Sequence, residues 1–239
     1  NKSMQTTQMG SERKTLLRKL VRVVISLVIF AFGLDLTVKA DIGVGPWDVM
    51  ALGISYHTPL AYGQVLIAVS LLVVLVDLLM HEHIGYGTLL DAVLTGTFVD
   101  IYGAMDLVPE NLPLYYSVPL YLLGMFIMVW GVYLHMSSGQ SSGPRDSFMV
   151  GLGKRMPKLP IGAVSIGIQC AVLVIGWLIG GPVGIGTLLS VFVYGLMLQF
   201  VCHVMHFEPR QVQHKGLVEA TAILLGRSKT KDAAPAKEN

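Results

Sequence analysis

Long apolar runs separated by short polar segments are the main pattern of this chain. Six runs are long enough to cross a bilayer as helices that rise about 1.5 Å per residue. They span residues 20–38, 61–80, 86–105, 114–136, 161–179 and 186–205. The pattern predicts an all-α polytopic membrane protein with six transmembrane helices.

Two shorter segments, residues 46–56 and 144–156, each begin with a helix-start signal. The first signal is Gly45 with Pro46, and the second is Gly143 with Pro144. Glycine suits the N-cap, and proline suits the first helical residue because the N–H that it lacks would have no partner there. Each segment covers about half the thickness of the hydrocarbon core. We therefore predict two short re-entrant helices, with full but bent spans as the alternative.

The short segments belong to an internal repeat. "GPWD" at 45–48 matches "GPRD" at 143–146, and "GYGTLL" at 85–90 matches "GIGTLL" at 184–189, in the same order and at nearly the same spacing. Three spans in each half, which we favour, would make the halves inverted in the membrane, whereas four would make them parallel. The predicted divisions are a basic interfacial lead-in (1–19), a first membrane repeat (20–110), a second membrane repeat (111–206) and a cytoplasmic C-terminal tail (207–239).

Composition agrees with a membrane location. The chain has 239 residues and is 53% hydrophobic and 13% charged, whereas soluble domains carry about 25% charged residues. The net charge of +2 is too small to suggest a nucleic-acid partner. Cys170 and Cys202 lie inside apolar runs, so we expect neither a disulfide framework nor a zinc site. The sequence contains no HExxH, GxSxG or Cys-His pattern, so we expect no enzyme activity, cofactor or metal.

The positions of the basic residues predict an orientation. With a cytoplasmic N-terminus and six spans, all of the 17 Lys and Arg residues except Lys39 lie on the cytoplasmic side. Membrane proteins carry an excess of Lys and Arg in their cytoplasmic loops. We therefore predict a multi-pass protein with both termini in the cytoplasm.

Asp48 and Asp146 fall in the first turns of the two short segments, where a carboxylate interacts favourably with the helix dipole. One interpretation is helix capping at the membrane surface. The other is a transport site, because broken helices in inverted repeats place their N-termini beside the solute. The duplication favours the transport site. Trp47 in the first copy is replaced by Arg145 in the second, so the two half-sites need not share a role.

A polar stripe follows the last span of each half. The first stripe contains Thr88, Asp91 and Thr95, and its counterpart contains Thr187 and Ser190. A charged residue at the centre of a bilayer costs at least about 2.5 kcal/mol, and such residues mark solute and ion pathways. We assign Asp91 to a solute path. Asp100 faces the other side of the same helix, and we assign it to helix–helix hydrogen bonding.

Histidines gather at the predicted cytoplasmic ends of the spans. They are His81, His83, His135, His203 and His206, with Glu82 among them. Their spacing is not diagnostic of a metal site, and we favour positions at the membrane interface. Asp77 also lies near a cytoplasmic end, so we expect its carboxylate to reach the membrane surface.

The first half of the chain carries a family resemblance. "FGLDLTVKADIGVGPWDVMALGIS", followed by "YGQ" and "IGYGTLLDAVLTGTFVD", resembles the YczE/YyaS/YitT group of bacterial integral membrane proteins. The similarity covers residues 20 to 205. It implies a small multi-spanning protein of the bacterial cytoplasmic membrane and adds little biochemistry.

These patterns support two hypotheses of function. The first is a small-solute transporter or channel whose central path is lined by half-helix N-termini and carboxylates, which would permit proton coupling. The second is a membrane-embedded partner or assembly subunit that transports nothing itself. Both place the chain in the lipid bilayer and allow a homo-oligomer or a membrane protein partner. The candidate path residues are Trp47, Asp48, Thr88, Asp91, Thr95, Arg145, Asp146, Thr187 and Ser190.

Overall fold

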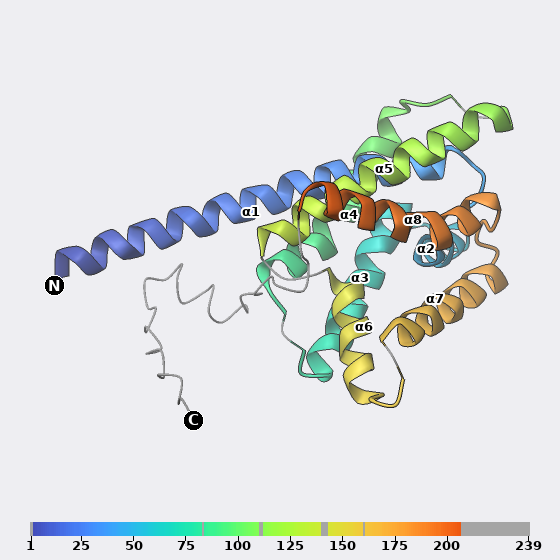
Figure 1. The fold of residues 1–239 in the computed structure, drawn as a ribbon. Helices are drawn as coiled ribbons and strands as arrows, with labels where there is room; N and C mark the ends of the chain where they lie inside the picture. Colours follow the sequence, from blue (N-terminus) through green and yellow to red (C-terminus); the bar gives the residue numbers. More distant parts are fainter. Residues whose placement is uncertain (1, 83, 110–111, 140–142, 160, 207–239) are drawn as a thin grey trace.

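The computed structural model describes residues 2–82, 84–109, 112–139, 143–159 and 161–206. These ranges form eight α-helices and contain no strand (Figure 1). The helices are α1 (Lys2–Lys39), α2 (Pro46–Tyr56), α3 (Tyr62–Leu79), α4 (Tyr86–Met105), α5 (Leu114–Ser138), α6 (Pro144–Arg155), α7 (Ile161–Leu178) and α8 (Ile185–Val204). The prediction of an all-α protein is confirmed for this part of the chain.

The predicted helix starts are also confirmed. Gly45 and Gly143 are the N-caps of α2 and α6 in extended backbone conformation, and a proline follows each of them as the first helical residue. The lead-in predicted at 1–19 forms, from Lys2 onward, the first part of α1. The predicted tail at 207–239 lies outside the described residues.

Four of the described helical segments are both long and apolar enough to cross a membrane. They are Arg13–Lys39, Tyr62–Leu79, Leu114–Ser138 and Ile185–Val204. The described apolar part of α7, Ala163–Leu178, is shorter. The helices therefore have the length and composition of a multi-pass membrane protein.

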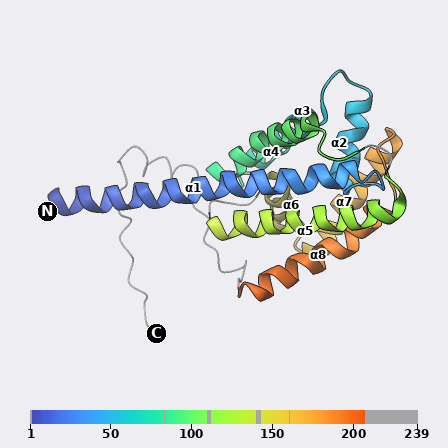
Figure 2. The ribbon, with the colours of Figure 1, turned by 90° about the horizontal axis from the view of Figure 1, so that it is seen from above.

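The centre of the bundle is an antiparallel pair of helices, α1 and α5 (Figure 2). Phe30 lies against Gly131, while Gly33 lies against Gly124, so residue numbers rise along one helix as they fall along the other. A Cβ atom at Gly33 would stand 2.5 Å from the carbonyl oxygen of Gly124. The two backbones touch, which is how helices gain close packing in lipid, where no hydrophobic driving force draws them together.

Helix α4 runs parallel to α1. Leu16 packs beside Tyr86 at one end of the pair, and the carboxylate of Asp35 lies near Gly103 at the other end. On the other side of the bundle, α8 runs parallel to α5. There Tyr121 lies beside Gly186, and Tyr133 packs in one cluster with Val201.

Helix α3 runs antiparallel to α4. A Cβ atom at Gly63 would collide with the carbonyl oxygen of Gly96, so the two helices touch at their backbones. The backbone N–H of Gly63 donates a hydrogen bond of 2.6 Å to the carboxylate of Asp100. Asp100 therefore joins two helices, as predicted. Since α4 is parallel to α1, α3 is antiparallel to α1.

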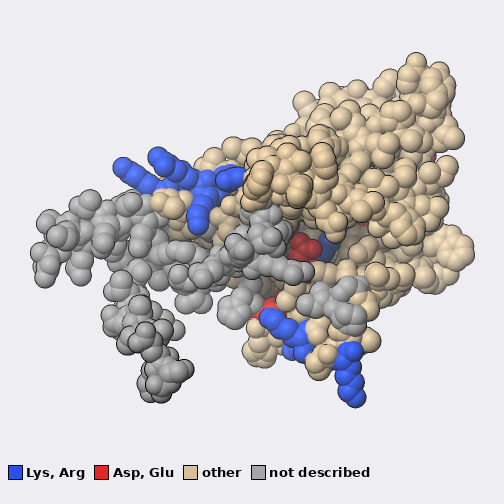
Figure 3. Space-filling model, viewed as in Figure 1, with Lys and Arg blue, Asp and Glu red and all other residues tan. Residues whose placement is uncertain are grey.

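Each short helix packs on a helix of the other half of the chain: α2 lies on α7, and α6 lies on α3. Gly53 of α2 contacts Ile179 and Gly181 just beyond α7, and Gly151 of α6 contacts the side chains of Met80 and Glu82 just beyond α3. Lysine and arginine gather at one end of the bundle, as the two basic groups in Figure 3 show. The described members are Arg13, Lys14, Arg18, Lys19, Arg22, Lys154, Arg155 and Lys158.

Candidate functional site

The N-terminal turns of α2 and α6 meet inside the protein. Nη1 of Arg145 lies 3.7 Å from Oδ1 of Asp48. The guanidinium of Arg145 also stands over the ring of Trp47, 5.2 Å from the ring centroid. The hydroxyl of Tyr62 donates a hydrogen bond of 3.0 Å to the same Oδ1 of Asp48. The GPWD and GPRD motifs differ at one position, which is Trp47 in the first motif and Arg145 in the second. The two motifs contact each other through Arg145, which meets both Trp47 and Asp48.

The start of α8 holds the start of α2 in place. The backbone N–H of Gly186 donates a hydrogen bond of 2.7 Å to the carbonyl oxygen of Ile42, in the loop that leads to α2. Gly43 in that loop has a φ of +98°, a backbone conformation that favours glycine. A Cβ atom at this position would also collide with the backbone nitrogen of Gly184. Ser190 then lies beside Gly45, the N-cap of α2. The "GIGTLL" segment thus positions the first short helix.

The start of α6 lies against α4 in a similar way. A Cβ atom at Gly143, the N-cap of α6, would stand 2.5 Å from Oδ2 of Asp91. The other carboxylate oxygen of Asp91 accepts a hydrogen bond of 2.6 Å from the hydroxyl of Thr95. Asp91 is the sixth residue of α4, so the N-terminus of α6 lies about 8 Å inside the end of the bundle. A carboxylate at this position interacts favourably with the positive end of the α6 dipole.

The other end of α6 is held at the basic end of the bundle. Nζ of Lys154 lies 2.7 Å from Oε2 of Glu82, and Nη2 of Arg155 donates a hydrogen bond of 3.1 Å to the carbonyl oxygen of Met80. Both partners lie just beyond the C-terminus of α3, where a cation complements the helix dipole. Helix α6 therefore reaches from the interior of the protein to its basic end.

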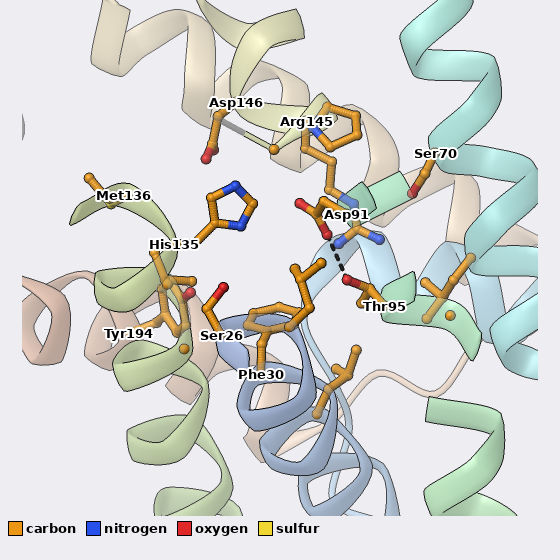
Figure 4. A pocket seen from close by; sticks show the side chains of 18 residues that line it. Ser26, Phe30, Ser70, Asp91, Thr95, His135, Met136, Arg145, Asp146 and Tyr194 are labelled. Atoms are coloured by element: carbon orange, nitrogen blue, oxygen red, sulfur yellow. Dashed lines mark hydrogen bonds between the residues drawn. The ribbon is translucent and has the colours of Figure 1, made fainter. Parts of the chain in front are cut away.

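A cavity of about 190 Å³ lies beside the start of α6 (Figure 4). Residues of α1, α3, α4, α5, α6 and α8 line it. Its polar side chains are Ser26, Ser70, Asp91, Thr95, His135, Arg145, Asp146 and Tyr194. A dry cavity of about 150 Å³ is known to hold benzene, so this volume suits a small organic molecule. Figure 3 shows a hollow in one face of the molecule with an acidic and a basic group exposed inside it.

Two polar groups in the cavity have no hydrogen-bond partner among the described residues. His135 is 7% exposed, and its Nε2 atom makes no hydrogen bond. The carboxylate of Asp146, an exposed residue, makes no hydrogen bond or ion pair with the part of the chain that the structure describes. Figure 4 shows the side chains of His135 and Asp146 pointing toward one another from α5 and α6. These groups are available to a molecule in the cavity.

The predicted path residues separate into three groups. Those that line the cavity are Asp91, Thr95, Arg145 and Asp146, with Gly143 and Pro144. Those at the start of α2, the helix that carries Asp48, the ion-pair partner of Arg145, are Gly45, Pro46, Trp47 and Asp48. Thr88, Thr187 and Ser190 line no part of the cavity, and the first two are buried in packing contacts at the starts of α4 and α8. The polar stripe is therefore divided between the cavity and the helix starts.

Sequence reasoning missed two residues of the interior. His135 was expected at the membrane interface, but it is buried and lines the cavity. Asp77 was expected to reach the surface, but it is fully buried, and neither of its carboxylate oxygens has a hydrogen-bond partner in the described structure. Both expectations were wrong because position along a span does not reveal which side of the helix faces protein. Within the described residues, no group of three or more His, Cys, Asp or Glu side chains is arranged to hold a metal ion.

Comparison with known proteins supports the resemblance noted in the sequence. Residues 17–203 match a sequence family described as "Family of unknown function (DUF6198)". The chain is 32% identical over 176 residues to the "Uncharacterized membrane protein YczE" of Bacillus subtilis (strain 168), a match that covers 73% of this chain and 80% of that protein. It is 30% identical to an "Uncharacterized protein" of Haemophilus influenzae, covering 75% of this chain and 81% of that protein. The "Uncharacterized protein YyaS" of Bacillus subtilis is 27% identical, with 73% and 87% covered. No solved structure matches the chain.

Proposed function

The chain belongs to the DUF6198 family and is similar to a membrane protein of Bacillus subtilis, and from this premise we propose that it is a small-solute transporter of the bacterial cytoplasmic membrane. One observation carries the proposal: the starts of two short helices meet at the Asp48–Arg145 pair, directly beside a cavity large enough for a small molecule. Backbone that is not helical is tolerated at membrane depth mainly where it is buried in protein or lines a cavity.

The directions of the helices support six spans with two re-entrant helices. Helix α3 is antiparallel to α1 although α2 lies between them in the sequence, so α2 adds no crossing of the membrane. Helix α2 has 11 residues and α6 has 12. At about 1.5 Å per residue, each is about half as long as the hydrocarbon core is thick.

The contacts of the short helices support inverted repeats. Aligning the two Gly-Pro motifs pairs Gly53 with Gly151, and aligning the two GxGTLL motifs pairs Ile179 with Met80 and Gly181 with Glu82. The contacts of Gly53 with Ile179 and Gly181 thus correspond to those of Gly151 with Met80 and Glu82. The first helices of the two repeats, α1 and α5, are antiparallel, which is expected when the symmetry axis lies in the membrane plane.

A second pair of contacts also corresponds between the two repeats. Gly45 lies beside Ser190, and Gly143 lies beside Asp91, and the aligned motifs pair these positions with each other. Each helix start is therefore held by a polar side chain from the last helix of the opposite repeat. A rocking motion of one repeat against the other would move both helix starts together, as alternating access requires.

The Asp48–Arg145 pair is the closed gate in this proposal. It joins the starts of α2 and α6, while the cavity lies between Arg145 and the basic end of the bundle. By the positive-inside rule the basic end faces the cytoplasm, so the cavity represents the inward-facing side. Separation of Asp48 from Arg145 would open the path to the outside. The carboxylates of Asp91 and Asp146 line the cavity, and protonation of either would couple transport to a proton gradient.

Uptake into reconstituted vesicles tests the proposal. The purified full-length protein is placed in liposomes, and accumulation of labelled amines, amino acids, carboxylates and sugars is measured with and without a pH gradient. We expect one solute class to accumulate with wild-type protein and not with Asp91→Asn. The exposed Asp41→Asn serves as the matched control. If Asp48→Asn and Asp91→Asn both keep full activity in the cell while charge reversal at Lys154 and Arg155 abolishes it, the chain is a partner subunit and the proposal fails.

A further inference from the structure

The charges of the cavity are not balanced. Asp91 and Asp146 bring two carboxylates to it from α4 and α6. Arg145 also lines the cavity, but its guanidinium is engaged by Asp48 and by the ring of Trp47. The positive charge is therefore already compensated by a carboxylate from α2, and within the described residues neither Asp91 nor Asp146 forms a close ion pair with a lysine or arginine.

The carboxylates of Asp91 and Asp146 and the ring of His135 can accept hydrogen bonds from a molecule in the cavity. An ionised carboxylate only accepts hydrogen bonds, and Nε2 of a neutral histidine accepts one when the proton is on Nδ1. His135 is more than nine-tenths buried, its Nε2 atom has no partner, and its ring projects into the cavity (Figure 4). Leaving a buried acceptor unpaired is destabilising, so a donor is expected at this place when the site is occupied.

We propose that the cavity binds a small organic cation that carries a primary ammonium group. The three N–H donors of the ammonium match Asp91, Asp146 and His135, which come from three different helices. The rings of Phe30 and Tyr194 line the same cavity and form an apolar and cation-attracting wall for the rest of the molecule. This assignment deepens the proposed function, because it names the solute class of the same site.

The arrangement favours an ammonium group over a metal ion. Zinc–ligand bonds to nitrogen and oxygen are about 2.0–2.2 Å long, whereas hydrogen bonds from nitrogen are about 2.9 Å long. The carboxylates and the histidine of the cavity form no metal-binding group within the described structure. The rings of Phe30 and Tyr194 in the same cavity suit the organic part of such a molecule.

Binding of four matched probes to the purified full-length protein in nanodiscs tests this inference. Benzylammonium, benzoate and benzyl alcohol have nearly the same size and differ in charge, and benzyltrimethylammonium keeps the charge without N–H donors. Binding is followed by calorimetry. We expect benzylammonium to bind at least about tenfold more tightly than the other three, a difference of about 1.4 kcal/mol.

Variants then test the individual contacts. Asp91→Asn and Asp146→Asn should each weaken benzylammonium binding at least about tenfold. His135→Leu should weaken the binding of benzylammonium more than that of benzyltrimethylammonium, because only the first can donate a hydrogen bond. Asp41→Asn, an exposed carboxylate outside the cavity, should leave the affinity unchanged.

The inference and the proposed function fail in different ways. Binding of benzylammonium without accumulation of any amine in vesicles would contradict transport and leave the cation site intact. Preferred binding of benzoate, equal binding of all probes, or no binding of benzylammonium at millimolar concentration would overturn the cation site. An affinity for benzylammonium that is the same in wild type, Asp91→Asn and Asp146→Asn would overturn it as well.

Discussion

Nη1 of Arg145 lies 3.7 Å from Oδ1 of Asp48, although the two residues begin different short helices in different halves of the chain. Asp48 is 6% exposed, and the side chain of Arg145 is 28% exposed. The pair is thus much better shielded from solvent than the ion pair of Lys39 with Asp106, in which the aspartate side chain is 71% exposed. Shielding strengthens the attraction and also raises the cost of leaving either charge alone.

A double-mutant cycle should therefore find strong coupling between Asp48 and Arg145. We expect Asp48→Asn and Arg145→Gln to destabilise the protein singly, and the double variant to lose less stability than the sum of the two, with a coupling of about 1–3 kcal/mol. Unfolding of the purified protein in detergent measures this. The matched cycle of Lys39→Gln with Asp106→Asn should give less than about 1 kcal/mol, because exposed pairs contribute little. Additive effects at Asp48 and Arg145 would contradict the contact.

The helices and their starting points could be predicted from the sequence because both depend on local chemistry. Span length follows from the thickness of the bilayer, and glycine followed by proline suits the N-cap and the first helical position. Gly45 and Gly143 were identified as N-caps on this basis, and the structure places them there. The partner of Arg145 could not be predicted, since the contact joins positions that only the packing of α2 and α6 brings together.

Burial within the spans could not be predicted either. A residue that faces lipid and one that faces another helix are both apolar, so the sequence of a span does not show which side is buried. His135 and Asp77 were misjudged for this reason. Asp100 was assigned correctly because its position on α4 opposite Asp91 separated two polar faces of one helix.

Cysteine labelling should place the two ends of the bundle on opposite sides of the membrane. In a chain with Cys170 and Cys202 replaced, Thr58→Cys after α2 and Lys158→Cys after α6 are both exposed. We expect an impermeant maleimide added to intact cells to label Thr58→Cys and to reach Lys158→Cys only after the membrane is opened. Labelling of both from the same side would contradict the six-span arrangement with two re-entrant helices.

Removal of the buried charge at Asp77 should stabilise the protein. Both carboxylate oxygens of Asp77 lack hydrogen-bond partners in the described structure, and the residue is fully buried. An unsatisfied buried polar group costs about 1–3 kcal/mol, and an amide is cheaper to bury than a carboxylate. We expect Asp77→Asn to raise the unfolding temperature in detergent, while the exposed Asp41→Asn leaves it unchanged. A lower unfolding temperature for Asp77→Asn would show that the carboxylate is paired.

Two glycines at matching places in the repeats should respond differently to alanine. A Cβ atom at Gly96 of α4 would collide with the carbonyl oxygen of Gly63 and stand 2.7 Å from the side chain of Ile67, whereas a Cβ atom at Gly195 of α8 meets nothing within 4 Å. Because the obstacle at Gly96 is backbone, α3 and α4 must separate to admit a methyl group, which costs about 1–3 kcal/mol. Alanine at an open helical position instead gains up to about 1 kcal/mol in helix propensity. We therefore expect Gly96→Ala to lower the unfolding temperature and Gly195→Ala to leave it unchanged or raise it, and the reverse order would contradict the packing of α3 on α4.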